Sequence, residues 1–217
     1  MMIKNINTKS YWDNRFASGD WENKNGRLQT RLFAESQVEH LNLSKDFEGT
    51  ILDFGCGLGD AMPVYLKHFP KSKLIGIDHS AAAIDLCLKN YKDISSFICG
   101  NLDDIPNVDV IIASNVMEHI SDDKKIISKM LSKCCELYII VPYKENPLCS
   151  EHINYYDKNY YDQFKPSEVK VFYSKGWTEY GYNLFINVYL KNILRPVFGK
   201  PFSSRRKQIM FHIKGDK

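Results

Sequence analysis

Two groups of residues in this chain have the types and the spacing to do chemistry. The first is Glu118 beside His119, an acid next to an imidazole, with a second imidazole later at His152. An imidazole changes its charge near neutral pH, so either histidine is a candidate general base. The second group is the run TILDFGCGLGD at 50–60, where an apolar stretch leads into three glycines. Glycine adopts positive φ angles and has no Cβ, so this backbone can approach a ligand closely.

Both groups lie next to apolar segments that indicate buried strands. We expect strands at 50–54, 73–78, 96–99, 108–114, 136–142, 168–173 and 208–213. Helices are expected at 60–69, after a cap at Ser80, and after a cap at Ser121. Continuous apolar strands that alternate with helices predict an α/β fold with a doubly wound, mostly parallel sheet. Ligands of such sheets bind at the carboxyl ends of the strands, which is where both groups of residues fall.

The spacing of the glycines separates the possible nucleotide cofactors. A dinucleotide fingerprint needs a glycine where this chain has Asp60, and a phosphate-binding P-loop needs a Gly-Lys-Ser/Thr that is absent. The remaining pattern is D-x-G-x-G-x-G, followed by an acid, Asp78, at the end of the second strand. This order of motifs resembles the class I S-adenosylmethionine-dependent methyltransferases over roughly residues 45–145. The resemblance implies S-adenosylmethionine as cofactor and a seven-stranded sheet with an antiparallel last strand.

The resemblance also assigns roles to the residues at the strand ends. Asp78 would accept hydrogen bonds from both ribose hydroxyls, and Asn101 with Leu102 would lie at the adenine edge, where many family members have Asp in place of Asn101. Free amides of the glycine turn would face the methionyl carboxylate, and Arg27 or Arg15 would pair with it, because a guanidinium fork matches a carboxylate. The expected cofactor-binding residues are Asp53, Gly55, Cys56, Gly57, Gly59, Asp78, His79, Asn101, Leu102, Asn115 and Arg27.

The segment NVMEHI at 115–120 resembles the LEHV-type signature of methyltransferases that act on small molecules, including ubiquinone-biosynthesis and polysaccharide-cluster enzymes. Some relatives hold a divalent metal with E-x-x-E-H and a later histidine. Here Asn115 replaces the first glutamate, and a hard cation such as Mg²⁺ prefers carboxylate oxygens, so we expect no metal. We expect Glu118, His119 and His152 to be the catalytic residues. The first two would shape the acceptor pocket, and His152 would be a base or a structural histidine.

The charge distribution singles out the C-terminal region of the chain, and the composition indicates a cellular compartment. The net charge is +3, but from residue 191 onward eight Lys/Arg face one Asp. The insertion at 178–206 is aromatic, then basic, so it could be a substrate lid, a dimer contact, or a peripheral membrane contact through 185–207. No apolar run approaches the ~18 residues of a spanning helix, and the first residues lack a signal-peptide core. Six cysteines without a CxxC pair indicate reduced thiols and a cytoplasmic protein.

The expected organisation is a single domain over 1–217. It comprises an N-terminal arm and helix at 1–44, with little regular structure up to residue 26, a cofactor-binding core at 45–145, and a substrate-side region at 146–217. The expected function is methyl transfer to an oxygen of a small molecule, sugar or glycan.

Other functions remain open from the sequence. N-methylation of an amino sugar or another small amine is one alternative, and a non-catalytic binding protein with this fold is another. An NAD-dependent oxidoreductase is opposed by Asp60. A nucleic-acid base methyltransferase is opposed by the missing N/D-P-P-Y/F motif. Neither the acceptor nor the oligomeric state follows from the sequence.

Overall fold

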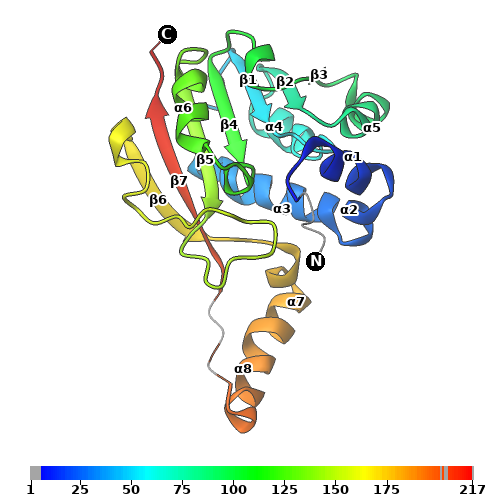
Figure 1. Cartoon of the computed structure of the whole chain (residues 1–217), viewed down its shortest axis with the longest axis vertical. Helices are drawn as coiled ribbons and strands as arrows, with labels where there is room; N and C mark the ends of the chain where they lie inside the picture. Colours follow the sequence, from blue (N-terminus) through cyan, green and yellow to red (C-terminus); the bar gives the residue numbers. More distant parts are fainter. Residues whose placement is uncertain (1–5, 201, 203–204, 217) are drawn as a thin grey trace.

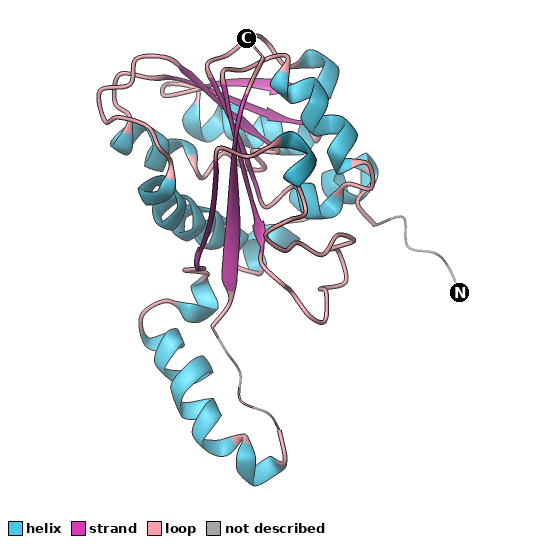
Figure 2. Cartoon of the chain, turned by 90° about the vertical axis from the view of Figure 1, so that its left-hand side faces the viewer, coloured by secondary structure: helices cyan, strands magenta, loops and turns pink. Residues whose placement is uncertain are grey.

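One twisted sheet runs through the computed structural model, which describes residues 6–200, 202 and 205–216 (Figures 1 and 2). Its strands are β1 Thr50–Phe54, β2 Lys73–Asp78, β3 Ser96–Cys99, β4 Val110–Ser114, β5 Glu136–Pro142, β6 Glu168–Tyr173 and β7 Lys207–Lys214. Their order in space is β3-β2-β1-β4-β5-β7-β6. All neighbouring strands are parallel except that β7 runs antiparallel to β5 and β6. The predicted fold class is confirmed, including the antiparallel last strand.

The central strands are apolar along their whole length because both faces of the sheet are covered. In β4, Val110 and Ile112 belong to one buried cluster, whereas Ile111 and Ala113 belong to the cluster on the other face. This alternation follows from the two-residue period of a strand. A strand covered on both sides therefore reads as an uninterrupted apolar run, as expected for parallel sheets.

Helices flank the sheet on both faces. They are α1 Lys9–Ala17, α2 Asp20–Asn23, α3 Gly26–Gln37, α4 Met62–His68, α5 Ala81–Tyr91 and α6 Asp123–Leu131. Two further helices, α7 Tyr182–Leu184 and α8 Lys191–Leu194, lie between β6 and β7 in the chain. Ser80 caps α5 as expected, since its Oγ accepts from the backbone N–H of Ala83 at 3.2 Å. The expected cap of α6 at Ser121 is wrong. That helix begins one residue later, because the Asp122 carbonyl accepts the first helical hydrogen bond, from Lys125 at 3.0 Å.

The expectation of little regular structure before residue 26 is also wrong, because α1 and α2 occupy part of that segment. The hydroxyl of Thr8 caps α1 by accepting from the Tyr11 N–H at 3.3 Å. Aromatic side chains of both helices pack with Leu58 and Ala83 of the core. Tertiary packing therefore orders a stretch whose polar composition gives no helical pattern of its own.

A buried acid ties the N-terminal helices to the core. Asp60 is 1% exposed. Its carboxylate accepts from Nε of Arg27 at 3.0 and 3.1 Å and from the Tyr91 hydroxyl at 2.6 Å, and Nη2 of Arg31 lies 3.4 Å away. The hydrogen bond to Asp60 also raises the pKa of Arg27. Removing one partner of such a buried pair leaves the others uncompensated.

After β6 the chain leaves the body of the protein before it returns as β7. Here α7 continues through a π-helical stretch, Phe185–Leu190, into α8, and a 3-10 turn, Pro196–Phe198, follows. Both views show this segment projecting away from the sheet (Figures 1 and 2). Residues 201, 203 and 204 of the expected insertion lie outside the described residues. Within the described chain, no helix combines the length and apolar character needed to cross a membrane.

The Asp60 contacts make a prediction about stability. Asp60→Ala should lower the free energy of unfolding by about 3 kcal/mol, because it strips a buried acid from its cationic and hydroxyl partners. Urea denaturation followed by circular dichroism measures the change. The matched control is Asp46→Ala, which removes an exposed pair with Lys71 at 3.1 Å. It should cost less than about 1 kcal/mol. An equal loss of unfolding free energy in the two variants would contradict the stabilising role of the Asp60 contacts.

Candidate active site

A cavity of about 430 Å³ opens at the carboxyl ends of β1, β2 and β4. Its volume lies in the range of small-molecule sites, roughly 300–1,000 Å³. Strand ends supply its polar groups, and α1, α2 and the turn after β4 supply its aromatic wall. The lining residues are Asn7, Trp12, Phe16, Trp21, Phe54, Gly55, Gly57, Ile77, Asp78, His79, Gly100, Asn101, Leu102, Asn115, Val116, His119, Ile120, Ser121 and Ile126.

The glycine turn forms one wall of this cavity through backbone that only glycine tolerates well. Gly55 and Gly57 have φ angles of +74° and +51°. A Cβ on Gly55 would lie 2.6 Å from Cγ2 of Val116, so no side chain fits there. Gly59 also has positive φ but is not among the lining residues, and a Cβ there would meet Cys87 Sγ at 3.1 Å. The first two glycines thus serve the pocket, and the third serves packing against α5.

Asp78 closes the turn and lines the same cavity. Its Oδ2 accepts from the Gly57 N–H and its Oδ1 accepts from the Ser80 N–H, each at 2.9 Å. Burial raises the pKa of Asp78, and these two hydrogen bonds oppose the rise. Each carboxylate oxygen has a second lone pair, so the group can still accept two hydrogen bonds from a ligand.

A smaller cavity of about 90 Å³ shares Trp21, Gly55, Gly57 and Asn115 with the first. Asp53 lines it and is 5% exposed. Burial, with a smaller contribution from the charge of Asp78, raises the pKa of Asp53 to about 8. A cationic group of a ligand in this cavity would supply a counter-charge beside Asp53 and favour its ionised form.

His119 lines the large cavity, as does His79. It ends the 3-10 turn Met117–His119, and its Nδ1 lies 3.1 Å from the backbone carbonyl of Glu151. An N–H at Nδ1 donates to that carbonyl, which leaves Nε2 with a lone pair. Burial, followed by the charge of His152, lowers the pKa of His119 to about 4. The ring also meets Trp12 edge-on, with 5.2 Å between centroids.

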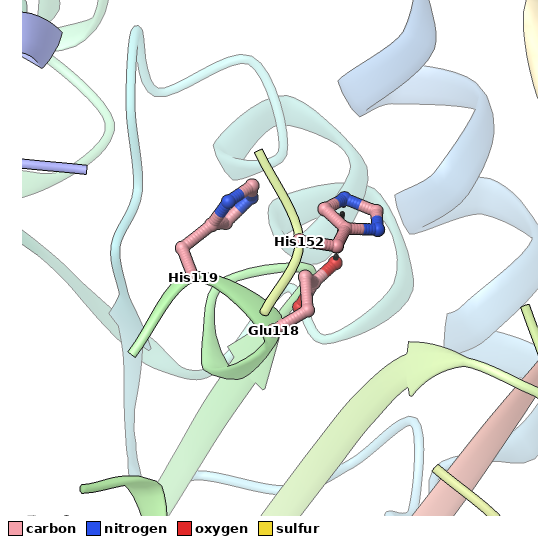
Figure 3. A group of neighbouring side chains, drawn as sticks. All are labelled: Glu118, His119 and His152. Atoms are coloured by element: carbon pink, nitrogen blue, oxygen red, sulfur yellow. Dashed lines mark ion pairs between the residues drawn. The ribbon is translucent and has the colours of Figure 1, made fainter. Parts of the chain in front are cut away.

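The buried Glu118 and the partly exposed His152 lie together beside His119 (Figure 3). His152 Nε2 lies 3.9 Å from Oε1 of Glu118, and its Nδ1 contacts the Glu145 carboxylate. Burial opposes the charge of His152, but the hydrogen bond that its Nδ1–H donates to the Glu145 carboxylate and the charge of Glu118 outweigh burial, so the pKa of His152 is raised. Glu118 is 1% exposed, and burial raises its pKa to about 7.

The loop that carries His152 is fixed by hydrogen bonds to the turn after β4. The Ile153 N–H donates to the Glu118 carbonyl at 2.9 Å, and Asn154 Nδ2 donates to the carbonyls of Met117 and Ile120 at 3.1 and 2.7 Å. These contacts explain how residues far apart in the chain come together. His152 is not among the residues that line the large cavity.

The part of the sequence that forms much of this cavity matches a known protein family. The sequence model of the methyltransferase domain family matches residues 51–136. This range contains the glycine turn, Asp78, and the turn that carries Glu118 and His119. Over these residues the chain carries a methyltransferase domain. No curated protein sequence matches it.

Solved structures resemble this methyltransferase over nearly its whole length. The plantazolicin methyltransferase BpumL, solved with S-adenosylhomocysteine (SAH), has 19% identity and a TM-score of 0.58, covering 98% of this chain and 97% of that one. A putative methyltransferase of Haloferax volcanii, solved with the activator Trm112, has 15% identity and a TM-score of 0.67, covering 95% and 98%. Coclaurine N-methyltransferase has 10% identity and a TM-score of 0.60, covering 83% and 71%. At these identities the likeness shows the fold alone.

The cavity fits the donor of such a methyltransferase in its size, its acids and its apolar walls. Asp78 offers this cavity a carboxylate, Leu102 and Ile126 offer it apolar side chains, and Asp53 lines the small cavity next to it. Two expected contacts are not formed as predicted. The N–H groups of Gly55 and Cys56 are already taken by the Ile77 carbonyl at 2.8 and 3.1 Å, so they do not face a ligand carboxylate.

The arginines expected at that carboxylate lie elsewhere. Arg27 contacts Asp60, Glu22 and Tyr91, and Arg15 contacts Glu151 and Tyr11. Neither lines the cavity, and none of the described lining residues is Lys or Arg. The burial of Asp60 explains the position of Arg27, since an interior carboxylate needs a cation more than a solvated ligand does.

The remaining expected cofactor residues divide between the two cavities. Gly55, Gly57, Asp78, His79, Asn101, Leu102 and Asn115 line the large one, and Asp53 and Cys56 line the small one. The sequence did not single out Glu145 and Glu151, whose acceptor oxygens contact His152 and His119. The nearness of both acids to His152 in the sequence was a signal for them, but their contacts with the histidines depend on the fold.

Glu118, His119 and His152 also have the geometry of a possible metal cluster, since one ligand atom of each lies within 4.8 Å of the others. The sequence favours no metal, because Asn115 replaces a carboxylate. The absence of a metal therefore stays a prediction.

The charges of the two histidines give a second prediction. In an NMR titration, we expect a pKa of about 4 for His119, because burial disfavours its charged form. The pKa of His152 should exceed the ordinary histidine value of about 6.5. Glu145→Gln should lower the pKa of His152 and leave the Nδ1 contact of His119 in place. Added Mg²⁺ should leave both signals unchanged. Shifts of both signals at one equivalent of metal would contradict the expectation of no metal.

Proposed function

We propose that this methyltransferase transfers the methyl group of S-adenosylmethionine to a hydroxyl oxygen of a small-molecule, sugar or glycan acceptor. The observation that carries the proposal is the position of His119. Its imidazole lines the donor cavity, is held by the Glu151 carbonyl, and has a pKa of about 4. The ring is therefore neutral at physiological pH and offers Nε2 as a hydrogen-bond acceptor.

The donor supplies a methyl group already activated on a sulfonium, so the protein's task is placement. The acid Asp78 and the apolar side chains Leu102 and Ile126 hold the nucleoside. Trp12, Phe16 and Trp21 cover the space next to the glycine turn and keep water from it. Holding two reactants in line is the main source of acceleration for such a transfer.

His119 would orient the acceptor by accepting its hydroxyl proton in a hydrogen bond at Nε2. A base of pKa about 4 does not remove the proton before the transfer, but it accepts charge as the oxygen attacks. Glu118 and His152 lie behind this ring, with the pKa of Glu118 near 7 and that of His152 raised. The ring centroids of His152 and His119 are 5.0 Å apart, which supports the proposal that the charge on this pair tunes His119.

A small amine acceptor is the second candidate. An amine needs only to be neutral, and His119 would accept a hydrogen bond from an N–H as well as from an O–H. The fold is shared with coclaurine N-methyltransferase, although at 10% identity that likeness carries no substrate. The two candidates differ in how strongly the rate depends on the histidine.

Binding of the donor is the first test of the proposal. Calorimetry should show binding of SAH and S-adenosylmethionine and none of NAD. Asp78→Ala should weaken SAH binding at least about tenfold, because two charge-assisted hydrogen bonds to the ribose are lost. Asp85→Ala, an exposed acid on α5, is the matched control and should bind as the parent does. Absence of SAH binding, or an unchanged affinity in Asp78→Ala, would refute the donor site.

Transfer itself is the second test. With a hydroxyl acceptor found by screening glycans and small alcohols, His119→Ala should reduce kcat/KM about 100-fold while SAH affinity stays unchanged. With an amine acceptor the loss should be much smaller. His68→Ala, on α4 and outside both cavities, is the control. A His119→Ala variant with full activity toward a hydroxyl would disprove the proposed orientation by Nε2.

A further inference from the structure

The helical segment between β6 and β7 exposes large apolar side chains to solvent. We call residues 182–200 the helical arm. Many of its large apolar side chains stand in solvent, with exposed fractions from 41% at Leu190 to 78% at Val197. The exposed apolar residues of the arm are Tyr182, Phe185, Tyr189, Leu190, Ile193, Leu194, Val197 and Phe198. An apolar surface of this extent marks a site of contact with something else.

The charges of the arm and its exit are all of one sign. Between residues 180 and 215 the sequence has no Asp or Glu, whereas Lys191, Arg195 and Lys200 lie on the arm and RRK at 205–207 follows it. Both views show the arm set apart from the body of the protein (Figures 1 and 2). Arg205, at the exit from the arm, lies 3.9 Å from the Glu179 carboxylate. The partner that covers the arm should therefore carry negative charge next to apolar groups.

Four alternative roles for the arm fit its sequence and position less well. The helical run 182–198 is exposed, so it is not a core helix, and it is shorter than the ~20 residues that span a bilayer. Packing against the arm of a second copy would bring two sets of like charges together without an acid between them. A lid over the large cavity is also disfavoured, because no described residue of the arm lines that cavity.

We propose that the helical arm binds the surface of an anionic lipid membrane. Its aromatic and aliphatic side chains would enter the boundary between headgroups and acyl chains, and its Lys and Arg side chains would contact lipid phosphates. The arm joins the carboxyl end of β6 to the start of β7. Because β6 is parallel to the central strands, the arm leaves the sheet at the same edge as the donor cavity. Membrane binding would thus place the cavity's edge of the sheet toward the lipid.

Co-sedimentation with vesicles tests the proposal on the full chain. The protein should pellet with vesicles of phosphatidylcholine and phosphatidylglycerol, and at least about tenfold less with phosphatidylcholine alone. Raising the salt from about 0.1 to about 1 M shortens the screening length from about 10 to about 3 Å and should weaken the binding. The double variant Val197→Asp/Phe198→Asp should lose most of the binding. Leu88→Asp, at an exposed leucine of α5, is the matched control and should retain it.

The outcome of the vesicle experiment tests membrane binding separately from binding of the methyl donor. Calorimetry with SAH should give the same affinity for the parent and the double variant, which shows that the variant is folded. Equal pelleting with both kinds of vesicle, or none with either, would overturn the proposal. If the parent is instead a dimer in sedimentation velocity that does not bind vesicles, and Val197→Asp/Phe198→Asp is a monomer, a second copy covers the arm and the lipid proposal is wrong.

Discussion

One carboxylate holds together the two turns on which the site is built. Asp78 stands at the end of β2 and accepts backbone N–H groups from Gly57, after β1, and from Ser80, before α5. Because β1 and β2 are parallel neighbours, their ends lie side by side, and the acid bridges them. The same carboxylate remains open to the cavity. Its role in folding therefore fixes its position for a ligand, and the glycines, which allow positive φ, let the backbone close around it.

Burial determines the charges on the acceptor side of the cavity. Burial lowers the pKa of His119, whereas Glu145 and Glu118 raise the pKa of His152. Two imidazoles whose centroids are 5.0 Å apart thus differ in their affinity for a proton. Separating the pKa values of neighbouring groups is how protein sites assign distinct acid and base roles.

The sheet could be predicted from the sequence because buried parallel strands leave uninterrupted apolar runs that end at glycines and acids. The strand-end residues that line the two cavities followed from the same reasoning. The positions of Arg15 and Arg27 could not be predicted, because each pairs with an acid, Glu151 or Asp60, that only the fold brings near. The helices α1 and α2 were missed for a related reason: they are stabilised by packing of Trp12 and Phe16 on the core, and local sequence does not encode such contacts.

Helix α1 touches both ends of the cavity. Asp13 accepts from the Ser80 hydroxyl at 2.6 Å, beside Asp78, and Arg15 pairs with Glu151, whose carbonyl holds His119. The same nine-residue helix therefore bears on the position of Asp78 through Ser80 and on that of His119 through Glu151. A displacement of α1 would disturb both ends of the cavity at once.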